Sequence, residues 1–92
     1  MNPTKLKRTL KQGGHVFGCM LSAMASTRFG APLAGAALDY AIVDSEHGSR
    51  DRTEIQGLCG MLRSADITPI VRVPIPKSEW VAMALDAGTA GV

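Results

Sequence analysis

The sequence predicts an α/β fold built from parallel strand–helix–strand units. Three short apolar runs, at 15–21, 40–44 and 69–73, are each followed by a segment of helical character. Strands that alternate with helices in this way pack as a parallel sheet with right-handed crossovers. The chain has 92 residues, which is enough for one small domain.

The first third of the chain supplies a leading helix and one strand–helix unit. We expect the leading helix over 1–12, because Gly13-Gly14 is a helix-stop signal. The first strand is expected at 15–21 and the second helix at 29–37. The run at 40–44 is then the second strand, and its continuous apolar character predicts burial on both faces.

The helix after 40–44 has the clearest entry in the sequence. Asp51 can cap its first turn, with Glu54 three residues later in capping-box position. Apolar residues then recur at helical spacing on one face. They are Ile55, Leu58 and Leu62.

The last third repeats the pattern and breaks off within it. Pro69 suits the first position of a strand at 69–73. Ser78 can cap the helix that follows, and Gly88 is expected just beyond its end. Residues 89–92 would begin a fourth strand. An eight-stranded barrel needs about 250 residues, so we expect the chain to be the front of a longer protein.

Composition excludes several classes of partner. Lys and Arg number 10 against 8 Asp and Glu, so the charge balance indicates neither a nucleic-acid nor a membrane partner. Aromatic residues make up 4%, which is too few for base-stacking platforms. The early basic residues, expected on the solvated face of the leading helix, precede no signal-peptide core. They are Lys5, Lys7, Arg8 and Lys11.

Two cysteines, Cys19 and Cys59, lie in a predicted strand and a predicted helix. Neither belongs to a CxxC pair or has a histidine at metal-ligand spacing. We expect both to be buried thiols in a reducing compartment, which favours a cytoplasmic protein.

Polar side chains gather where the second strand ends. Asp44, Glu46 and His47 follow its apolar run, and Arg72 is near the end of the third strand. Carboxyl ends of parallel strands share one edge of a sheet, where ligands bind in α/β folds. The sequence therefore predicts that a histidine, an arginine and carboxylates converge there.

Three blocks of sequence give this pattern a family resemblance. They are 39–48, with its D-x-E-H-G motif, 68–74, with V-R-V-P, and 85–92. Together they resemble successive blocks of the HpcH/HpaI aldolases, the metal-dependent (class II) pyruvate aldolases typified by 4-hydroxy-2-oxoheptane-1,7-dioate aldolase. The resemblance implies a TIM barrel, of which 1–92 would be the N-terminal part. This part comprises the leading helix, three βα units and the start of the fourth strand.

The resemblance implies an aldehyde-lyase activity. The family reversibly cleaves a 4-hydroxy-2-oxo acid to pyruvate and an aldehyde through a metal-bound enolate. Its base falls on His47, its enolate-stabilising arginine on Arg72 and the aspartate that supports the histidine on Asp86. By position alone, Asp44 is the simpler local partner of His47, because a helix that follows a strand leads away from the catalytic rim.

Each of these residues also has a structural interpretation. Arg72 can pair with Asp44 across the two strand ends, Asp86 can be an ordinary helix-terminal residue, and His47 can be a hydrogen-bonded loop residue. His15, at the opposite end of a strand, is expected to be structural. The sequence also departs from the family at three positions: Leu21, near a position often aromatic; Ala31, where glutamate is expected; and Ala37, where glycine is usual.

The resemblance also implies cofactors and partners. The full-length family uses Mg²⁺, Mn²⁺ or Co²⁺, whose Glu and Asp ligands come from later strands, so we expect no metal ligands in 1–92. The implied partners are a 2-oxo acid, an aldehyde and further subunits of a homo-oligomer, a hexamer or similar. A lyase acting on an acyl thioester, as citrate lyase β-chains do, fits the D-x-E-H-G motif less well.

The chain by itself is expected to be inactive, because it lacks that metal site. The alternative function is a non-catalytic (βα)₃ unit that acts through self-association or a partner. Three units leave two sheet edges open, and open edges invite pairing with other chains.

Overall fold

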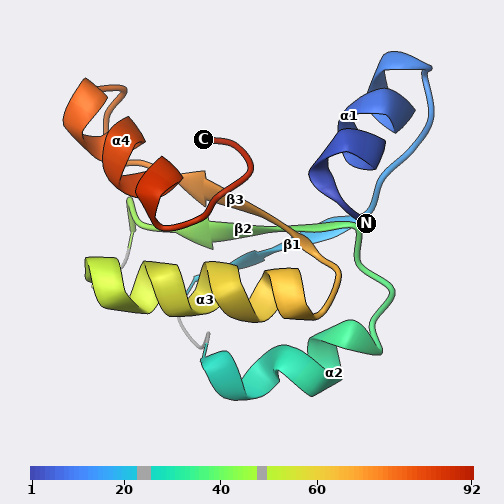
Figure 1. The fold of residues 1–92 in the computed structure, drawn as a ribbon, viewed down its shortest axis with the longest axis horizontal. Coiled ribbons are helices and arrows are strands. Elements are labelled where there is room, and N and C mark those ends of the chain that lie inside the picture. The colour runs from blue at the N-terminus through green and yellow to red at the C-terminus, as the bar shows by residue number, and fades with distance from the viewer. Residues whose placement is uncertain (23–25, 48–49) are drawn as a thin grey trace.

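The computed structural model describes residues 1–22, 26–47 and 50–92 and confirms the predicted alternation of strands and helices (Figure 1). Its elements follow the expected order. They are α1 (Pro3–Lys11), β1 (Gly18–Leu21), the 3-10 helix η1 (Thr27–Phe29), α2 (Gly30–Ala34), β2 (Tyr40–Asp44), α3 (Arg52–Ser64), β3 (Thr68–Arg72) and α4 (Ser78–Asp86).

The three strands form one parallel sheet in the order β1-β2-β3. Residues 18–21 of β1 pair with 40–43 of β2, and 40–44 of β2 pair with 68–72 of β3. A single parallel bridge joins Ile70 to Gly91, so the chain returns to the free edge of β3 where a fourth strand was expected. In Figure 1, α2 and α3 lie on one side of the sheet and α1 lies on the other.

Alternate residues of the strands face the helices and form the core. In β2 these are Ala41 and Val43, and in β3 the matching residues are Pro69 and Val71; all four are fully buried. They pack with one face of α3 and with part of α4. The helical members of this core are Ile55, Leu58, Cys59, Leu62, Met83 and Ala84.

The remaining residues of each strand point to the opposite face, because side chains alternate along a strand. This face is less covered by helices: Met20 is 45% exposed, and Ile42 and Ile70 are partly buried. Asp44 and Arg72 belong to this alternation and end it at the carboxyl edge of the sheet. The site is therefore built on the face that does not carry the main core.

The predicted start of α3 and the predicted end of α4 are confirmed, whereas the predicted cap of α4 is not. The Asp51 side chain accepts a hydrogen bond from the Glu54 N–H at 2.8 Å, as expected for the cap of α3. Gly88 follows α4 with φ +95°, a left-handed conformation that glycine adopts without steric cost. The predicted cap at Ser78 is wrong: Lys77 holds the cap position, without a side-chain hydrogen bond, and Ser78 is the first helical residue.

Two element boundaries differ from prediction near β1. The strand begins at Gly18 instead of residue 15, because Asp39 holds the chain at Phe17: its carboxylate accepts the Phe17 N–H at 2.8 Å. The helix expected over 29–37 is shorter, since η1 precedes it and α2 ends at Ala34. Ala37 follows in a left-handed conformation, φ +54°, that a helix cannot contain.

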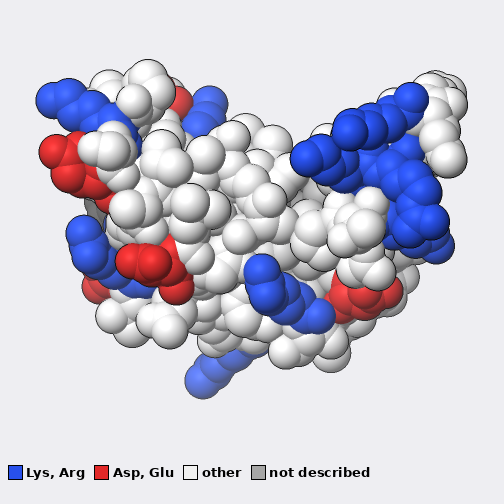
Figure 2. Space-filling view, turned by 45° about the horizontal axis from the view of Figure 1, so that its top comes forward, with Lys and Arg blue, Asp and Glu red and all other residues white. Residues whose placement is uncertain are grey.

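The basic residues of α1 form a solvated face, as predicted. Figure 2 shows the blue side chains gathered over this helix. These basic residues are all exposed, whereas Leu6 is partly buried. No helix in the described part of the chain is long and apolar enough to cross a membrane.

Candidate active site at the carboxyl ends of β2 and β3

Asp44 and Arg72 are register partners, the last paired residues of β2 and β3. The Arg72 Nε–H donates to Asp44 Oδ1 at 3.0 Å, and Arg72 Nη2 donates to Asp44 Oδ2 at 2.8 Å. This two-pronged geometry is the strong form of the arginine–carboxylate pair. The Asp44 side chain is 1% exposed and the Arg72 side chain 37%, so Arg72 is the solvent-accessible member of the pair.

Burial and pairing act against each other on Asp44. The hydrogen-bonded Arg72 guanidinium holds the pKa of this carboxyl well below its usual range, despite the opposing effect of burial. The carboxylate in turn raises the pKa of Arg72. Both groups are therefore fixed in their charged forms.

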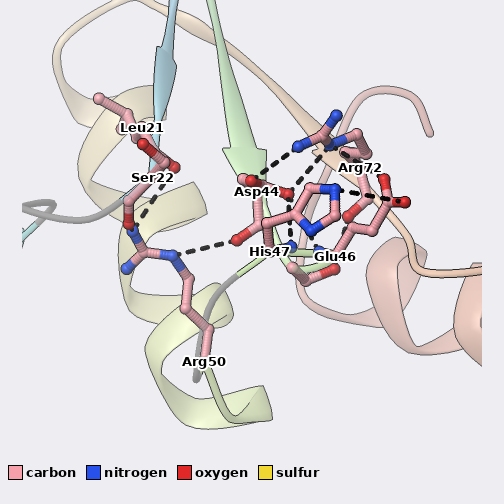
Figure 3. A network of polar contacts seen from close by, with 8 residues as sticks. Leu21, Ser22, Asp44, Glu46, His47, Arg50 and Arg72 are labelled. Atoms are coloured by element: carbon pink, nitrogen blue, oxygen red, sulfur yellow. Dashed lines mark hydrogen bonds and ion pairs between the residues drawn. The ribbon is translucent and has the colours of Figure 1, made fainter.

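Asp44 also shapes the loop that carries the histidine. Its Oδ1 accepts the backbone N–H groups of Glu46 at 3.0 Å and of His47 at 3.3 Å. A short aspartate side chain that accepts N–H groups two and three residues ahead forms a local turn. This turn brings His47 to the rim beside the Asp44–Arg72 pair (Figure 3).

The ring of His47 is 71% exposed, and its neighbour is Glu46. His47 Nε2 lies 3.6 Å from Glu46 Oε1, and Glu46 Oε2 lies 3.4 Å from Arg72 Nε. Glu46, one of the carboxylates expected at this edge, therefore stands between the imidazole and the guanidinium. In this structure Asp44 accepts the backbone N–H of His47 and forms an ion pair with Arg72, so its role as the partner of the His47 ring stays a prediction.

Asp86, carried over from the family resemblance, does not join this cluster. It ends α4 and lines a shallow hollow with Arg52 and Gln56 of α3. Within the described residues, neither a hydrogen bond nor an ion pair connects Asp86 to His47. This agrees with the expectation that a helix after β3 leads away from the rim.

Arg50 is a site residue that sequence reasoning missed. Its Nε–H donates to the Asp44 carbonyl at 3.2 Å, and its Nη2 contacts the carbonyls of Leu21, at 3.5 Å, and Ser22. It thereby links the end of β1 to the end of β2 (Figure 3). The one feature of the sequence that could have indicated Arg50 is its position directly before the Asp51 cap. Gly48, the last residue of the D-x-E-H-G motif, lies outside the described residues.

The arrangement offers an accessible imidazole and a fixed positive charge side by side. A guanidinium has five N–H donors, and Asp44 engages two of them, so three remain outside this pair on a side chain that is 37% exposed. Across residues 1–22, 26–47 and 50–92, no group of three or more His, Cys, Asp or Glu side chains is placed to hold a metal ion. The carboxylates near His47 are engaged by Arg72 and do not fit a metal-ligand set.

Comparisons with known proteins point to one family. The chain is 33% identical over 82 residues to a hydroxypyruvate/pyruvate aldolase of Roseobacter denitrificans, covering 89% of this chain and 32% of that protein. It superposes on an HpcH/HpaI aldolase from Desulfitobacterium hafniense with a TM-score of 0.81 and 34% identity, over 91% of this chain and 32% of that one. No family model matches the sequence.

A second solved structure widens the range of chemistry that this fold hosts. The citrate synthase SbnG superposes with a TM-score of 0.80 and 26% identity, over 91% of this chain and 34% of its own. The chain thus spans about a third of the length of the relatives it matches. The expected partial TIM-barrel fold is confirmed by these superpositions.

Proposed function

We propose that the chain is part of an HpcH/HpaI-type aldolase, whose members it matches over about a third of their length, and that it carries the base and the oxyanion-stabilising arginine of a pyruvate aldolase. The reaction would be the reversible cleavage of a 4-hydroxy-2-oxo acid to pyruvate and an aldehyde. The observation that carries the proposal is the fixed Arg72 guanidinium beside the accessible His47 imidazole at one sheet edge.

His47 would move the proton in this reaction. In the cleavage direction a base takes the proton of the C4 hydroxyl, the C3–C4 bond breaks, and its electron pair forms the enolate of pyruvate. A proton then returns to C3. The side chain is 71% exposed and can reach a ligand, and the two ring nitrogens of an imidazole can accept and donate a proton. A positioned base typically contributes about 10²–10⁴-fold to rate.

Arg72 would stabilise the negative oxygen that develops on the pyruvate unit. Asp44 holds the guanidinium through two hydrogen bonds, so its remaining donors are oriented before substrate arrives. Donors fixed in advance are effective because they need no rearrangement during the reaction, and loss of one costs about 2.7–4 kcal/mol.

The whole protein would have partners that the described residues do not supply. Family resemblance suggests a divalent ion, Mg²⁺, Mn²⁺ or Co²⁺, which would act as a Lewis acid on the keto acid. The described residues offer no group of His, Cys, Asp or Glu side chains that fits such an ion. We further propose a cytoplasmic homo-oligomer of the full-length protein, and no turnover by the 92-residue chain alone.

A segment swap tests the proposal. Residues 1–92 replace the matching segment of the Roseobacter denitrificans aldolase, and deuterium exchange at the methyl carbon of pyruvate is followed by NMR with added Mg²⁺, Mn²⁺ or Co²⁺. We expect exchange by the swapped protein and none by the 92-residue chain. His47→Ala should lower exchange about 10²-fold or more, whereas His15→Ala, the other histidine, should leave it unchanged. A folded swap in which His47→Ala retains full exchange would refute the assignment of the base.

The second candidate function is self-association without catalysis. It is favoured by the open β1 edge and by two exposed side chains beside it, Phe17 at 70% and Met20 at 45%. Both can be covered by a second copy of the chain. Light scattering on the purified chain decides: a defined oligomer that Met20→Lys dissociates supports this function, and a monomer excludes it.

A further inference from the structure

We propose that Arg50 is a positioning residue: it holds the end of β1 against the end of β2 and thereby fixes the loop that carries His47. This inference rests on the proposed function, because it gives Arg50 a role in the same site. Arg50 touches neither the His47 ring nor the Arg72 guanidinium in the described contacts, so its action would pass through Asp44.

Two of the carbonyls that Arg50 contacts lie beyond the paired part of β1 and β2. Pairing of β1 with β2 ends at Leu21 and Val43, so the carbonyl groups of Ser22 and Asp44 are past the last paired residues. Arg50 donates to both carbonyls. Its guanidinium therefore extends the connection between the two strands by side-chain hydrogen bonds at the point where the backbone ladder stops.

The shape of arginine suits this task. A guanidinium presents several N–H donors in a rigid planar fork and can bond carbonyls of two segments at once. A lysine offers one compact ammonium on a flexible stem and cannot span both in the same way. The backbone of Arg50 is held in place at the start of α3, because the next residue, Asp51, caps this helix.

Asp44 connects the hydrogen bonds of Arg50, which clamp the ends of β1 and β2 together, to the residues proposed to act in the reaction, His47 and Arg72. Arg50 holds its backbone carbonyl, and Arg72 holds its carboxylate. The same carboxylate accepts the backbone N–H of His47. A change in the orientation of Asp44 would therefore shift the histidine loop and the guanidinium together.

The first test is hydrogen exchange by NMR on the 92-residue chain. Arg50→Met is expected to raise the water-exchange rates of the Glu46 backbone N–H and the Arg72 Nε–H about tenfold, while the core amides of Leu62 and Val71 stay within about twofold. Arg52→Met is the matched control: it removes an arginine from the other side of Asp51 whose side chain makes no hydrogen bond or ion pair with any described residue. Arg52→Met should change none of these rates.

The results separate positioning from general stability. Unchanged rates at Glu46 and Arg72 in Arg50→Met would overturn the proposal, and so would an equal rise at the core amides. If Arg50→Met prevents folding, Arg50→Lys is measured instead; it should speed exchange at the same two groups and no others. The same pattern from Arg52→Met would likewise count against a specific role of Arg50.

The second test uses the active segment swap described above. Arg50→Met should lower kcat for methyl exchange at least about tenfold, with KM for pyruvate changed less than threefold, because the reacting groups are misplaced and not removed. An unchanged kcat would overturn the proposal even if loop exchange rises. If the segment swap is inactive even without a substitution, this result contradicts the proposed function. It leaves the test of Arg50 in place, because the hydrogen-exchange rates of the 92-residue chain report on Arg50 independently.

Discussion

The carboxylate of Asp44 and the guanidinium of Arg72 meet through two hydrogen bonds, 2.8 and 3.0 Å long, where β2 and β3 end side by side. Asp44 is 1% exposed, so its charge is removed from water and depends on this partner. Four donors in all point at the carboxylate, two from Arg72 and two from the loop backbone. The pair thus anchors the turn as well as the arginine.

Removal of Arg72 should destabilise the chain strongly. Arg72→Met leaves the Asp44 charge without its partner at a site that is 1% exposed, and an unpaired buried charge destabilises the folded state. We expect a smaller loss than for a pair buried on both sides, because the Arg72 side chain is 37% exposed. Urea unfolding of Arg72→Met measures the loss, and Arg63→Met, at an exposed position of α3, should change stability by less than about 0.5 kcal/mol. If Arg72→Met loses no more stability than Arg63→Met, Arg72 does not compensate the buried charge of Asp44.

The pH dependence of stability follows from the same pair. Arg72 lowers the pKa of Asp44 in the folded state, so the unfolded chain binds this proton more readily. The contribution is present above the ordinary carboxyl pKa of about 4 and is lost as pH falls below it toward the folded pKa. Thermal unfolding should therefore show stability falling from about pH 5 downward. In Asp44→Asn this fall should be much smaller, and an equal slope in both proteins would contradict the assignment.

The sheet and its main helix could be predicted from the sequence because their signals are local. The apolar run 40–44 and the cap at Asp51 each specify an element without reference to the rest of the chain. The start of β1 could not be predicted in this way. It depends on a hydrogen bond from the Phe17 N–H to the Asp39 carboxylate. These residues are distant in sequence, and no periodic pattern of side chains indicates their contact.

The candidate site was predictable to a similar degree. That Asp44 and Arg72 meet follows from strand order, since both residues end adjacent parallel strands. The contacts of Glu46 and Arg50 depend instead on the path of the loop between β2 and α3. No spacing rule describes that path, so the position of Glu46 beside the imidazole and the clamp made by Arg50 required the structure.

The two cysteines should differ in reactivity, although the sequence predicted burial for both. Cys59 is fully buried, and burial raises the pKa of its thiol, whereas Cys19 on the edge strand is partly exposed. Since the thiolate is the reactive form, an alkylating reagent should modify Cys19 first. Mass spectrometry after brief iodoacetamide treatment should find one label in the native chain and two after unfolding in urea. In Cys19→Ser the native chain should stay unlabelled; rapid labelling of Cys59 would show that α3 does not pack as described.

Ala37 offers a direct test of the backbone between α2 and β2. Its φ of +54° lies in the left-handed region, where a Cβ atom meets the following carbonyl oxygen and costs about 1–2 kcal/mol. Glycine has no such cost, which gives a physical reason for the glycine that the family resemblance leads one to expect here. Part of the gain is offset by the greater freedom of glycine in the unfolded chain.

Ala37→Gly should therefore stabilise the chain, by about 0.5–1 kcal/mol in urea unfolding. The neighbouring Ala36→Gly is the matched control, because Ala36 does not have a positive φ and its substitution adds only unfolded-state freedom. That variant should lose about 0.5 kcal/mol or more. The opposite signs of two identical substitutions at adjacent positions cannot arise from composition or from a general change in the unfolded state. If both variants are destabilised alike, Ala37 does not adopt the left-handed conformation in solution, and the connection between α2 and β2 must follow another path.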